Sequence, residues 1–588
     1  MKRIFSSLKP YWLYVLAILA LTFVQVVYCD LQLPNLMSDI ISKGVASGDK
    51  AVVWESGIRM LLLTAVSVVC AIVIAFLASL VSRKVSRDLR HQVFTKVEGF
   101  SLAEFDKVGT ASLITRTTND VLQVETFLQM IFMVALAAPF TFVGAGIMAY
   151  QKDPQLSLVI YGTIPVLIVL ISVVVGFGMP LLKTLQQKID TLNRVTREAL
   201  TGIRVIRAYN RTGYEEKRFE GVSRDYADTA IKINRIMGAM MPIIFLIVNS
   251  ASVVIVWVAA LQITNNDPAQ AAATSGNFIA VIGYSMQTLF SIMMFSIVFV
   301  LLPRAVASTT RIEEVLSITP TIVDQPNPAQ ITSGEHGHLQ FAAVSLTYEG
   351  AEEPTLCDID FDLRPGETTT IIGSTGSGKS TIVNLMMRFY DPTKGTILLD
   401  GVDIKTLAQH DLRGRIGYVP QKAFLFEGTI KENILYGNED ATDEEVAHAA
   451  KIAQAADFIE AKPKGYDDFV AQGGTNLSGG QKQRLAIARA LVRKPEVYIF
   501  DDSFSALDLE TDAKLQAALK PEIAKSGATN VVIAQRVASA MSADRVIVLD
   551  EGRVDGIGTH EELLETSKVY QEIVASQITT TEGGQDVA

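Results

Sequence analysis

Charged residues are scarce in this chain, and cysteine is scarcer still. Asp, Glu, Lys and Arg make up 19% of the 588 residues, against about 25% in soluble domains, and the deficit is concentrated in the first half. The three cysteines, Cys29, Cys70 and Cys357, are scattered without metal-ligand spacing, so we interpret them as packing residues with free thiols. The net charge of −10 and the lack of a basic cluster argue against nucleic acid as a partner.

Hydrophobic residues, in contrast, make up 49% of the chain, and before residue 304 they gather in six long stretches. Each stretch is long enough to cross about 30 Å of hydrocarbon. We therefore predict six transmembrane helices at about 11–33, 58–82, 128–150, 156–178, 238–262 and 278–302. The first exceeds the apolar region of a signal peptide and lacks a small-residue cleavage site, so it is predicted to remain as a span.

Basic residues differ sharply between the two sets of loops that join these spans. Segment 83–127 holds seven Lys and Arg residues and segment 180–236 holds twelve, whereas the opposite loops hold only Lys43, Lys50 and Lys152. The positive-inside rule therefore predicts a plasma or inner membrane protein with both long loops, both termini and the second half of the chain in the cytoplasm.

A glycine-rich loop in the second half follows an apolar run and precedes a helix-like segment. Glycines let backbone N–H groups surround phosphate oxygens at a helix N-terminus. Lys379 is predicted to reach the β- and γ-phosphates of a nucleotide, and the Ser380 hydroxyl is predicted to ligate Mg²⁺. The predicted nucleotide-binding residues of this loop are Gly373, Ser374, Thr375, Gly376, Ser377, Gly378, Lys379, Ser380 and Thr381.

A second motif is the run Val497–Phe500, which leads directly into Asp501 and Asp502. Four apolar residues that end at an acid are typical of the strand of a P-loop ATPase whose aspartate faces Mg²⁺, here Asp501. The next position normally holds a glutamate that polarises the attacking water, and here it holds Asp502. The sequence thus predicts a nucleoside triphosphate site with one weakened hydrolytic part.

Between these motifs, the pentapeptide Leu477, Ser478, Gly479, Gly480 and Gln481 resembles the signature of ATP-binding cassette (ABC) proteins. It offers a serine hydroxyl and glycine N–H groups at a helix start to a γ-phosphate. In the family this surface faces the nucleotide held by the other cassette of a dimer.

Three further segments match the family in order and spacing. The resemblance implies that Tyr348 stacks on adenine, that Gln421 senses Mg²⁺ and the membrane domain, and that Ser505–Asp508 crosses the dimer interface. Taken singly, Tyr348 would more simply be a strand aromatic and Gln421 a surface glutamine.

One departure from the family pattern concerns the histidine that contacts the γ-phosphate at the end of a strand. The matching position is Gln535, and the only histidine downstream of Asp501 is His560, which the family carries at a helix start. Glutamine donates a hydrogen bond but carries no positive charge. Asp502 is also one methylene shorter than glutamate, and a misplacement of roughly 1–1.5 Å can cost about 100-fold in rate.

Together these two changes resemble the degenerate-site subunit of bacterial heterodimeric multidrug-type ABC exporters. The predicted degenerate catalytic positions are Asp502 and Gln535. Tolerated drift in a slow homodimer is the alternative.

The two long loops, of roughly 45 to 57 residues, resemble the intracellular domain of the exporter class. This implies short coupling helices near 101–109 and 208–216. Phe105, Tyr209 and Tyr214 are then candidates to enter a groove on a cassette, unless they fold back on their own helices. Importer permeases have shorter couplers and usually a separate ATPase chain, so the fused layout favours export.

Polar residues inside the spans are the only local indications about cargo, and they are Gln25, Asp30, Asn249 and Gln287. An ionisable residue in a span marks a transport pathway by default, although Asp30 near the outer end of the first predicted span also fits solvation among lipid headgroups. The sixth span is rich in flexible apolar side chains, which suit an adaptable cavity but equally suit helix packing or lipid contact. They are Met286, Phe290, Met293, Met294 and Phe295.

The predicted fold is multidomain: an all-α polytopic membrane domain with long cytoplasmic extensions, and an α/β P-loop NTPase cassette with a helical subdomain. The predicted boundaries are 1–316 for the membrane domain, 317–336 for a linker, 337–578 for the cassette, about 425–490 for its helical subdomain and 579–588 for a disordered tail.

The predicted function is one half of an ATP-driven exporter of hydrophobic or amphipathic compounds, with a second, non-identical half-transporter as partner. The expected cofactors are ATP and Mg²⁺, the latter held by Ser380, Gln421 and Asp501. A regulatory or sensor subunit, and a slow homodimeric transporter of lipid or peptide, are the alternatives. The sequence does not name the cargo.

Overall fold

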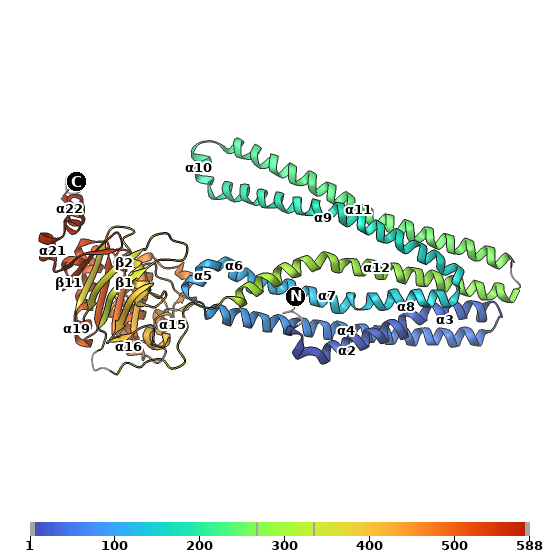
Figure 1. Ribbon diagram of the computed structural model, residues 1–588, viewed down its shortest axis with the longest axis horizontal. Helices are drawn as coiled ribbons and strands as arrows, with labels where there is room; N and C mark the ends of the chain where they lie inside the picture. Colours follow the sequence, from blue (N-terminus) through green and yellow to red (C-terminus); the bar gives the residue numbers. More distant parts are fainter. Residues whose placement is uncertain (1–5, 266–267, 333–335, 583–588) are drawn as a thin grey trace. The chain divides into compact units, whose positions relative to one another are not determined.

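The computed structural model describes residues 6–265, 268–332 and 336–582. Its internal contacts divide the chain into two units (Figure 1), which we call the helical unit and the α/β unit. The helical unit comprises residues up to Glu98 together with Ala111–Ile318. The α/β unit comprises Gly99–Thr110 together with the chain from Thr319 onward.

Six helical segments among the described residues are long and apolar enough to cross a membrane by length and composition, which confirms the predicted membrane fold class. Four are continuous: α4 (Lys50–Glu98), α9 (Pro154–Thr201), α11 (Thr212–Asn265) and α12 (Pro268–Ser317). The first is assembled from η1 (Lys9–Tyr11), α2 (Trp12–Phe23), η2 (Val24–Cys29), η3 (Asp30–Gln32), α3 (Leu33–Asp39) and η4 (Ile40–Val45). The third is assembled from α6 (Thr110–Thr115), η5 (Arg116–Asp120), α7 (Val121–Met130), η6 (Ile131–Ala135) and α8 (Ala137–Lys152).

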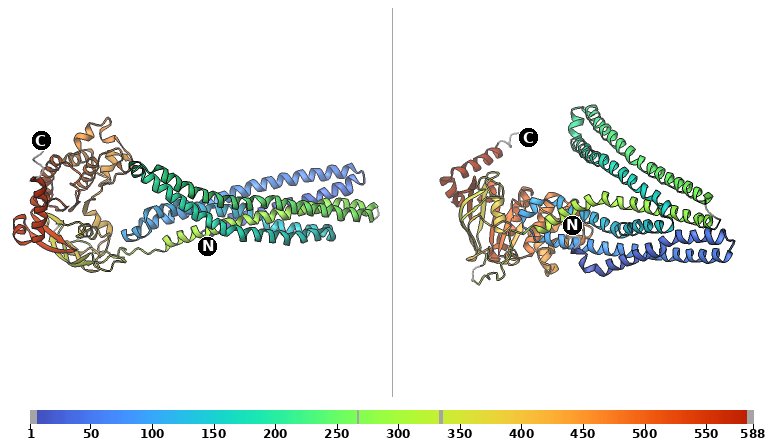
Figure 2. Two further views of the ribbon diagram at one scale, coloured as in Figure 1. Left: turned by 90° about the horizontal axis from the view of Figure 1, so that it is seen from above. Right: turned by 45° about the vertical axis from the view of Figure 1, so that its right-hand side comes forward.

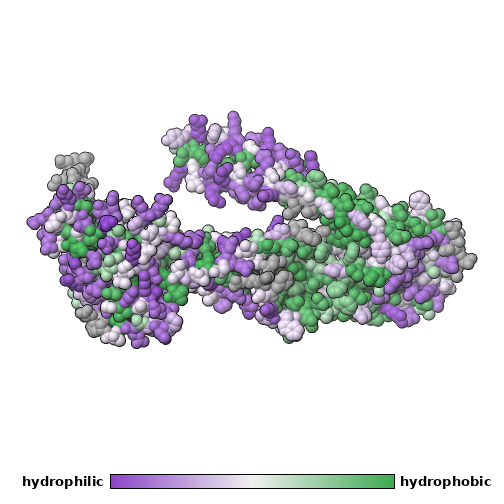
Figure 3. All heavy atoms as spheres, viewed as in Figure 1, coloured by the Kyte–Doolittle hydropathy of each residue, from purple (hydrophilic) through white to green (hydrophobic). Residues whose placement is uncertain are grey.

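Within the helical unit, α9 and α11 run side by side and are joined by the short helix α10 (Ile203–Ala208). This hairpin diverges from α4, α7 and α12 toward its α10 end (Figures 1 and 2). Hydrophobic residues cover a broad band of the helices away from the α10 end, whereas hydrophilic residues cover the α10 end (Figure 3). The apolar band and the polar extensions are thus separate parts of the same helices.

Two features of the helical unit differ from the sequence-based expectation. The first apolar helix continues to Val45 instead of ending near residue 33. The second short helix lies at Ile203–Ala208, just before the predicted 208–216. Tyr209 and Tyr214 are 76% and 62% exposed, so their rings do not fold back onto their own helices.

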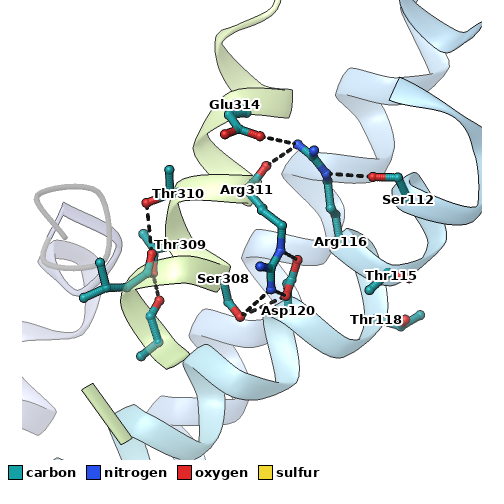
Figure 4. Close-up of polar contacts among 12 residues, drawn as sticks. Ser112, Thr115, Arg116, Thr118, Asp120, Ser308, Thr309, Thr310, Arg311 and Glu314 are labelled. Carbon is teal, nitrogen blue, oxygen red and sulfur yellow. Dashed lines mark hydrogen bonds and ion pairs between the residues drawn. The ribbon is translucent and has the colours of Figure 1, made fainter. Parts of the chain in front are cut away.

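An ion pair ties the third helical segment to α12 (Figure 4). Asp120 is fully buried, and the Arg311 guanidinium donates to both of its carboxylate oxygens, with Nε 2.7 Å from Oδ2. Ser308 Oγ also donates to Asp120 Oδ1 at 2.8 Å. Next to this pair, Arg116 Nη1 lies 3.0 Å from Glu314 and donates to the Arg311 carbonyl oxygen.

The α/β unit contains a six-stranded and a four-stranded sheet. The first has the order β12-β11-β3-β10-β9-β6, and all its neighbouring strands are parallel except β11 and β12. Its strands are β3 (Thr368–Gly373), β6 (Ile416–Val419), β9 (Val497–Asp501), β10 (Thr529–Ala534), β11 (Arg545–Asp550) and β12 (Arg553–Gly558). The second is antiparallel, with β2 (Leu356–Leu363), β1 (Leu339–Leu346), β4 (Lys394–Leu399) and β5 (Val402–Asp403) in that order.

Two apolar cores pack on opposite faces of the parallel sheet. In β9, Val497 and Ile499 join the core that holds α13 (Lys379–Met386) and the antiparallel sheet. Tyr498 and Phe500 point the other way, into a core with the helices around the signature pentapeptide. Because both faces are covered, the strand is continuously apolar, which explains the run that made it recognisable in the sequence.

The remaining elements are mostly helices. They are α5 (Leu102–Val108), α14 (Gln409–Gly414), β7 (Gly428–Thr429), α15 (Ile430–Leu435), α16 (Asp443–Ile452), α17 (Ala456–Glu460), η7 (Gly465–Asp467), β8 (Phe469–Val470), η8 (Gln472–Gly474), α18 (Gly479–Val492), α19 (Leu509–Ser526), α20 (Val537–Met541), α21 (His560–Thr566) and α22 (Lys568–Glu582). The sequence predicts a disordered tail over 579–588. Helix α22 extends to Glu582, and residues 583–588 lie outside the described residues.

Candidate nucleotide-binding site

The glycine-rich loop joins β3 to the N-terminus of α13. Gly378 is the N-cap of α13 with φ of 99°, a left-handed conformation that other residues rarely adopt. A Cβ atom on Gly373 would lie 2.3 Å from the Leu549 carbonyl oxygen, so only glycine fits there. The loop residues Ser374, Thr375 and Gly376 are exposed, which leaves the turn accessible to a ligand.

Lys379 lies under this loop and is 8% exposed. Its Nζ donates to the carbonyl oxygens of Gly373 at 2.8 Å and of Ser374 at 2.7 Å. Burial lowers the pKa of Lys379, although the nearby carboxylates Asp502 and Asp501 act in the opposite direction. A buried ammonium group bound only to neutral oxygens is a strong attractor for phosphate.

Four adjacent parallel strands, β3, β10, β9 and β6, all end at the same edge of the sheet. The loop follows β3, Gln535 follows β10, Asp501 ends β9, and Gln421 lies two residues after β6. In open α/β sheets, ligands bind at the carboxyl ends of the strands. The strand order therefore brings together residues that are far apart in the chain.

Asp501 and Asp502 place two acids next to each other at this edge. Asp501 is 7% exposed, and burial, followed by the charge of Asp502, raises its pKa to about 6, with Lys379 acting against both. Asp502 is partly exposed, and its φ of 46° is in the left-handed region. Its backbone N–H donates to the Ile533 carbonyl oxygen at 2.9 Å, which fixes the turn beside β10.

The Asp502 carboxylate accepts hydrogen bonds from two glutamine amides. Gln421 Nε2 lies 3.1 Å and Gln535 Nε2 lies 3.2 Å from Asp502 Oδ2. The two positions that depart from the family pattern, Asp502 and Gln535, are thus in direct contact. We call Gln421, Asp502 and Gln535 the amide–carboxylate trio.

The signature pentapeptide starts helix α18 on the surface of the α/β unit. Ser478 is the N-cap, and its hydroxyl accepts from the Gln481 N–H at 3.3 Å. Ser478 and Gly479 are exposed, whereas Leu477 is buried. Gly480 lies against the loop Ser505–Asp508, because a Cβ atom on it would lie 3.4 Å from the Ala506 carbonyl oxygen.

Tyr348 lies beside the glycine-rich loop, where its hydroxyl donates to Thr381 Oγ1 at 3.2 Å. Its ring meets the edge of Tyr390 with centroids 5.0 Å apart. Burial, followed by the charge of Asp106, raises the pKa of Tyr390 to about 12. Tyr390 was missed by sequence reasoning, because no motif distinguishes it from any other aromatic after a helix.

Helix α5, which lies in the predicted first coupling segment, is bound within the α/β unit near this tyrosine pair. Lys107 Nζ lies 2.9 Å from Glu349, and the Tyr390 hydroxyl lies 3.4 Å from Asp106. Glu104 accepts from the backbone N–H groups of Ser101 and Thr321. Burial tends to raise the pKa of Glu104, but these hydrogen bonds outweigh it and the net shift is downward.

The last histidine, His560, begins helix α21 and hydrogen-bonds the Tyr570 hydroxyl at 2.7 Å. His560 is therefore not part of the trio, in which Gln535 directly follows the end of strand β10. The geometry defines a class of protein: a P-loop ATPase whose nucleotide-binding unit is fused to a set of apolar, membrane-length helices.

Comparisons with known proteins identify the family. Residues 14–293 match the family described as ABC transporter transmembrane region, and residues 356–505 match the family described as ABC transporter. The chain is 39% identical to an uncharacterised ABC transporter ATP-binding protein of Mycobacterium tuberculosis over 98% of both chains. It is 31% identical to an ATP-dependent lipid A-core flippase of Thiobacillus denitrificans, again over 98% of both chains.

A solved structure of a bacterial Atm1-family ABC exporter with ATP bound aligns with a TM-score of 0.77 at 26% identity, covering 96% of this chain and 98% of that one. The chain therefore belongs to the ABC transporter family. It is a multi-pass membrane protein in which an ATP-binding cassette is fused to the membrane domain of an exporter half-transporter.

Proposed function

We propose that this chain is the degenerate-site subunit of a heterodimeric ABC exporter: its own loop retains ATP, and its signature pentapeptide completes the hydrolytic site of a partner. The observation that carries the proposal is the amide–carboxylate trio. Asp502 stands where a longer carboxylate would reach the attacking water, and both of its side-chain neighbours in the trio are neutral amides. The phosphate loop and the signature, in contrast, keep all their parts.

In this proposal each residue at the strand edge has a separate role. Lys379 and the loop N–H groups hold the β- and γ-phosphates, and Tyr348 stacks on adenine. Asp501, Ser380 and Gln421 offer the hard oxygen ligands that suit Mg²⁺. The residues fit this ion, because a buried Asp501 carboxylate whose pKa is raised by burial and by Asp502 is stabilised by a nearby cation. When bound, the ion neutralises phosphate charge.

Opening and closing of two cassettes around ATP would bias the membrane helices between inward-facing and outward-facing states, because ATP binds the closed pair more tightly. We place the cassette in the cytoplasm, since the long loops carry nineteen Lys and Arg residues and the short loops very few. The cargo in this proposal is hydrophobic or amphipathic. A relative that is named as a lipid A-core flippase supports this class.

The proposal is tested by comparing equivalent changes in the two halves of the co-expressed exporter. Asp502→Ala should lower its ATPase activity less than about threefold. Replacing the glutamate at the matching position of the partner with alanine should lower activity by about 100-fold or more, the usual contribution of a general base. Glu444→Ala, an exposed change on α16, serves as a control for folding of this cassette.

Equal and large losses from both changes would contradict the asymmetry. Two other outcomes point to the alternatives. Full transport by this chain alone would indicate a homodimer, and ATP binding without dye accumulation in inverted vesicles of the co-expressed halves would indicate a regulatory subunit.

A further inference from the structure

An acidic residue, Asp30, lies where the first apolar helix changes its hydrogen-bonding pattern. Asp30 lies where the π-helical turn η2 gives way to the 3-10 turn η3. Two other membrane helices reach it: Ser67 Oγ of α4 donates to Asp30 Oδ1 at 2.7 Å, and Gln287 Nε2 of α12 donates to the Asp30 carbonyl oxygen at 3.0 Å. We call Asp30, Ser67 and Gln287 the membrane polar cluster.

This cluster lies deep in the apolar part of the helical unit, not at its rim. On α4, Ser67 is eight residues from Arg59 and sixteen from Arg83, or about 12 Å and 24 Å along the helix. On the first helix, the ion-paired Asp39 lies nine positions beyond Asp30. The first helix continues fifteen residues beyond Asp30 to Val45, so Asp30 lies within the helix and not at its end.

Two acceptor groups of the cluster lack a cationic partner in the part of the chain that the structure describes. Among the described residues, no Lys, Arg or His forms an ion pair with Asp30, whose side chain accepts a hydrogen bond from the Ser67 hydroxyl. The Gln287 Oε1 atom is buried without a hydrogen-bond partner. Its amide orientation is fixed, because only the NH₂ group can face the Asp30 carbonyl oxygen.

Uncompensated acceptors of this kind are costly in an apolar layer. A ligand that carries positive charge and N–H donors would satisfy acceptors of this kind. Two apolar side chains, Met286 and Phe290, lie near Gln287 in the sequence of α12. They are 41% and 56% exposed. They offer a flexible apolar surface to the rest of such a ligand.

We propose that the membrane polar cluster binds the protonated amine of an amphipathic cargo. The ammonium N–H groups donate to the Asp30 carboxylate and to Gln287 Oε1, while the apolar part of the molecule lies along α12. Ser67 acts as a positioning residue, because its hydroxyl holds the carboxylate. The inference deepens the proposed export function by naming a substrate class, and it is independent of which cassette hydrolyses ATP.

The test uses the full-length chain in phosphatidylcholine nanodiscs, without nucleotide or partner. The probes are monodansylcadaverine, which carries a primary amine protonated at pH 7, and its neutral N-acetyl derivative. Fluorescence anisotropy, corrected with empty nanodiscs, measures both dissociation constants. The wild-type chain should bind the amine about tenfold or more tightly than the acetylated probe, as expected for a charged hydrogen bond.

Asp30→Asn should remove this preference by weakening amine binding at least tenfold and leaving the acetylated probe unchanged. Asp30→Glu should keep the preference. Asp39→Asn is the matched control, because Asp39 lies on the same helix and pairs with Lys43 at 3.0 Å, and it should bind both probes as the wild type does. Ser67→Ala should weaken amine binding by a smaller factor.

Three results would overturn the inference: no preference for the amine in the wild type, an unchanged preference in Asp30→Asn, or an equal loss of both probes in that variant. Because no ATP is present, the inference can fail while the asymmetric ATPase mechanism stands, and the reverse also holds.

Discussion

At the scale of single residues, Asp502 combines an unusual backbone with a restrained side chain. Its φ of 46° is a conformation in which aspartate is several-fold enriched among non-glycine residues. Its carboxylate is held by Gln421 and Gln535 from the two flanking strand ends. These hydrogen bonds fix a carboxylate that is one methylene shorter than glutamate, which is the basis of the proposal that this site retains its nucleotide.

Restoring the family residues in this trio should therefore restore hydrolysis. The double variant Asp502→Glu with Gln535→His is expected to raise the ATPase activity of this chain's own site by about 10- to 100-fold, because the longer carboxylate recovers the lost reach. Each single variant should gain much less. The measurement is phosphate release by the co-expressed pair in which the partner's glutamate is replaced by alanine.

Replacing the partner's glutamate inactivates the other composite site, so the phosphate released comes from this chain's own site. Gln421 is left unchanged in all variants. If the double variant hydrolyses ATP no faster than its parent, the shortened acid and the missing histidine are not the cause of the low activity.

Tyr390 packs against Tyr348, the residue that is predicted to stack on adenine. The ring-edge contact between Tyr348 and Tyr390, with centroids 5.0 Å apart, is worth about 0.5–1.5 kcal/mol. Tyr390→Ala should thus raise the dissociation constant for ATP by about 2- to 10-fold, whereas Tyr390→Phe should change it little. Calorimetric titration measures both.

The matched control is Tyr436→Ala, an aromatic of the same unit that is 64% exposed, and it should leave ATP affinity unchanged. Equal effects of the alanine and phenylalanine variants of Tyr390 would assign the effect to the hydroxyl and its contact with Asp106, not to the ring.

At the scale of elements, the Asp120–Arg311 pair joins η5 to α12 with unequal burial of its two partners (Figure 4). The Asp120 side chain is 0% exposed, whereas that of Arg311 is 45% exposed. Loss of Arg311 leaves a buried carboxylate with Ser308 as its remaining described partner. Loss of Asp120 leaves a guanidinium that reaches water and lies near Glu314.

Arg311→Ala should consequently destabilise the protein more than Asp120→Ala does. The expected costs are about 3 kcal/mol for Arg311→Ala, as for a broken buried pair, and about 1 kcal/mol for Asp120→Ala, as for an exposed one. The apparent melting temperature of the detergent-solubilised chain provides the order of the two variants.

Arg224→Ala is the control, because this arginine forms an exposed pair with Glu220 within one helix. It should behave almost as the wild type. A melting temperature lower in Asp120→Ala than in Arg311→Ala would show that the arginine, not the acid, depends on the pair.

At the scale of the whole molecule, the features predicted from sequence are those encoded by neighbouring residues. The loop before α13 and the start of α18 are contiguous motifs, and the apolar spans are long runs. Contacts such as Asp502 with Gln421 depend on the order of β10, β9 and β6 in the sheet, which no local pattern contains. Asp120 and Arg311 lie 191 residues apart, and nothing in either segment indicates the other.

Two helices have bounds that differ from the predicted segments for local physical reasons. Asp30 and Pro34 look like the end of a span, but Pro34 lies in the first turn of α3, where its missing N–H costs nothing. The helix therefore continues. Near the second short helix, Asn210 adopts φ of 52°, so the chain turns after Ala208 and the segment 208–216 is divided between a turn and α11.

The proposed asymmetry between the two composite sites should also appear in the ATP turnover of variants that change the signature or the phosphate loop of this cassette. Ser478→Ala alters the surface lent to the partner's nucleotide, whereas Lys379→Ala alters the loop of this chain's own site, where little hydrolysis is expected. In the co-expressed pair, Ser478→Ala should therefore lower ATP turnover more than Lys379→Ala, although only Lys379→Ala should reduce retention of labelled ATP by this subunit.

Thr475→Ala, exposed just before the signature, is the control for local folding. The reverse ranking would place productive hydrolysis on this chain's own loop, and brisk ATP cleavage by the chain purified without a partner would lead to the same conclusion.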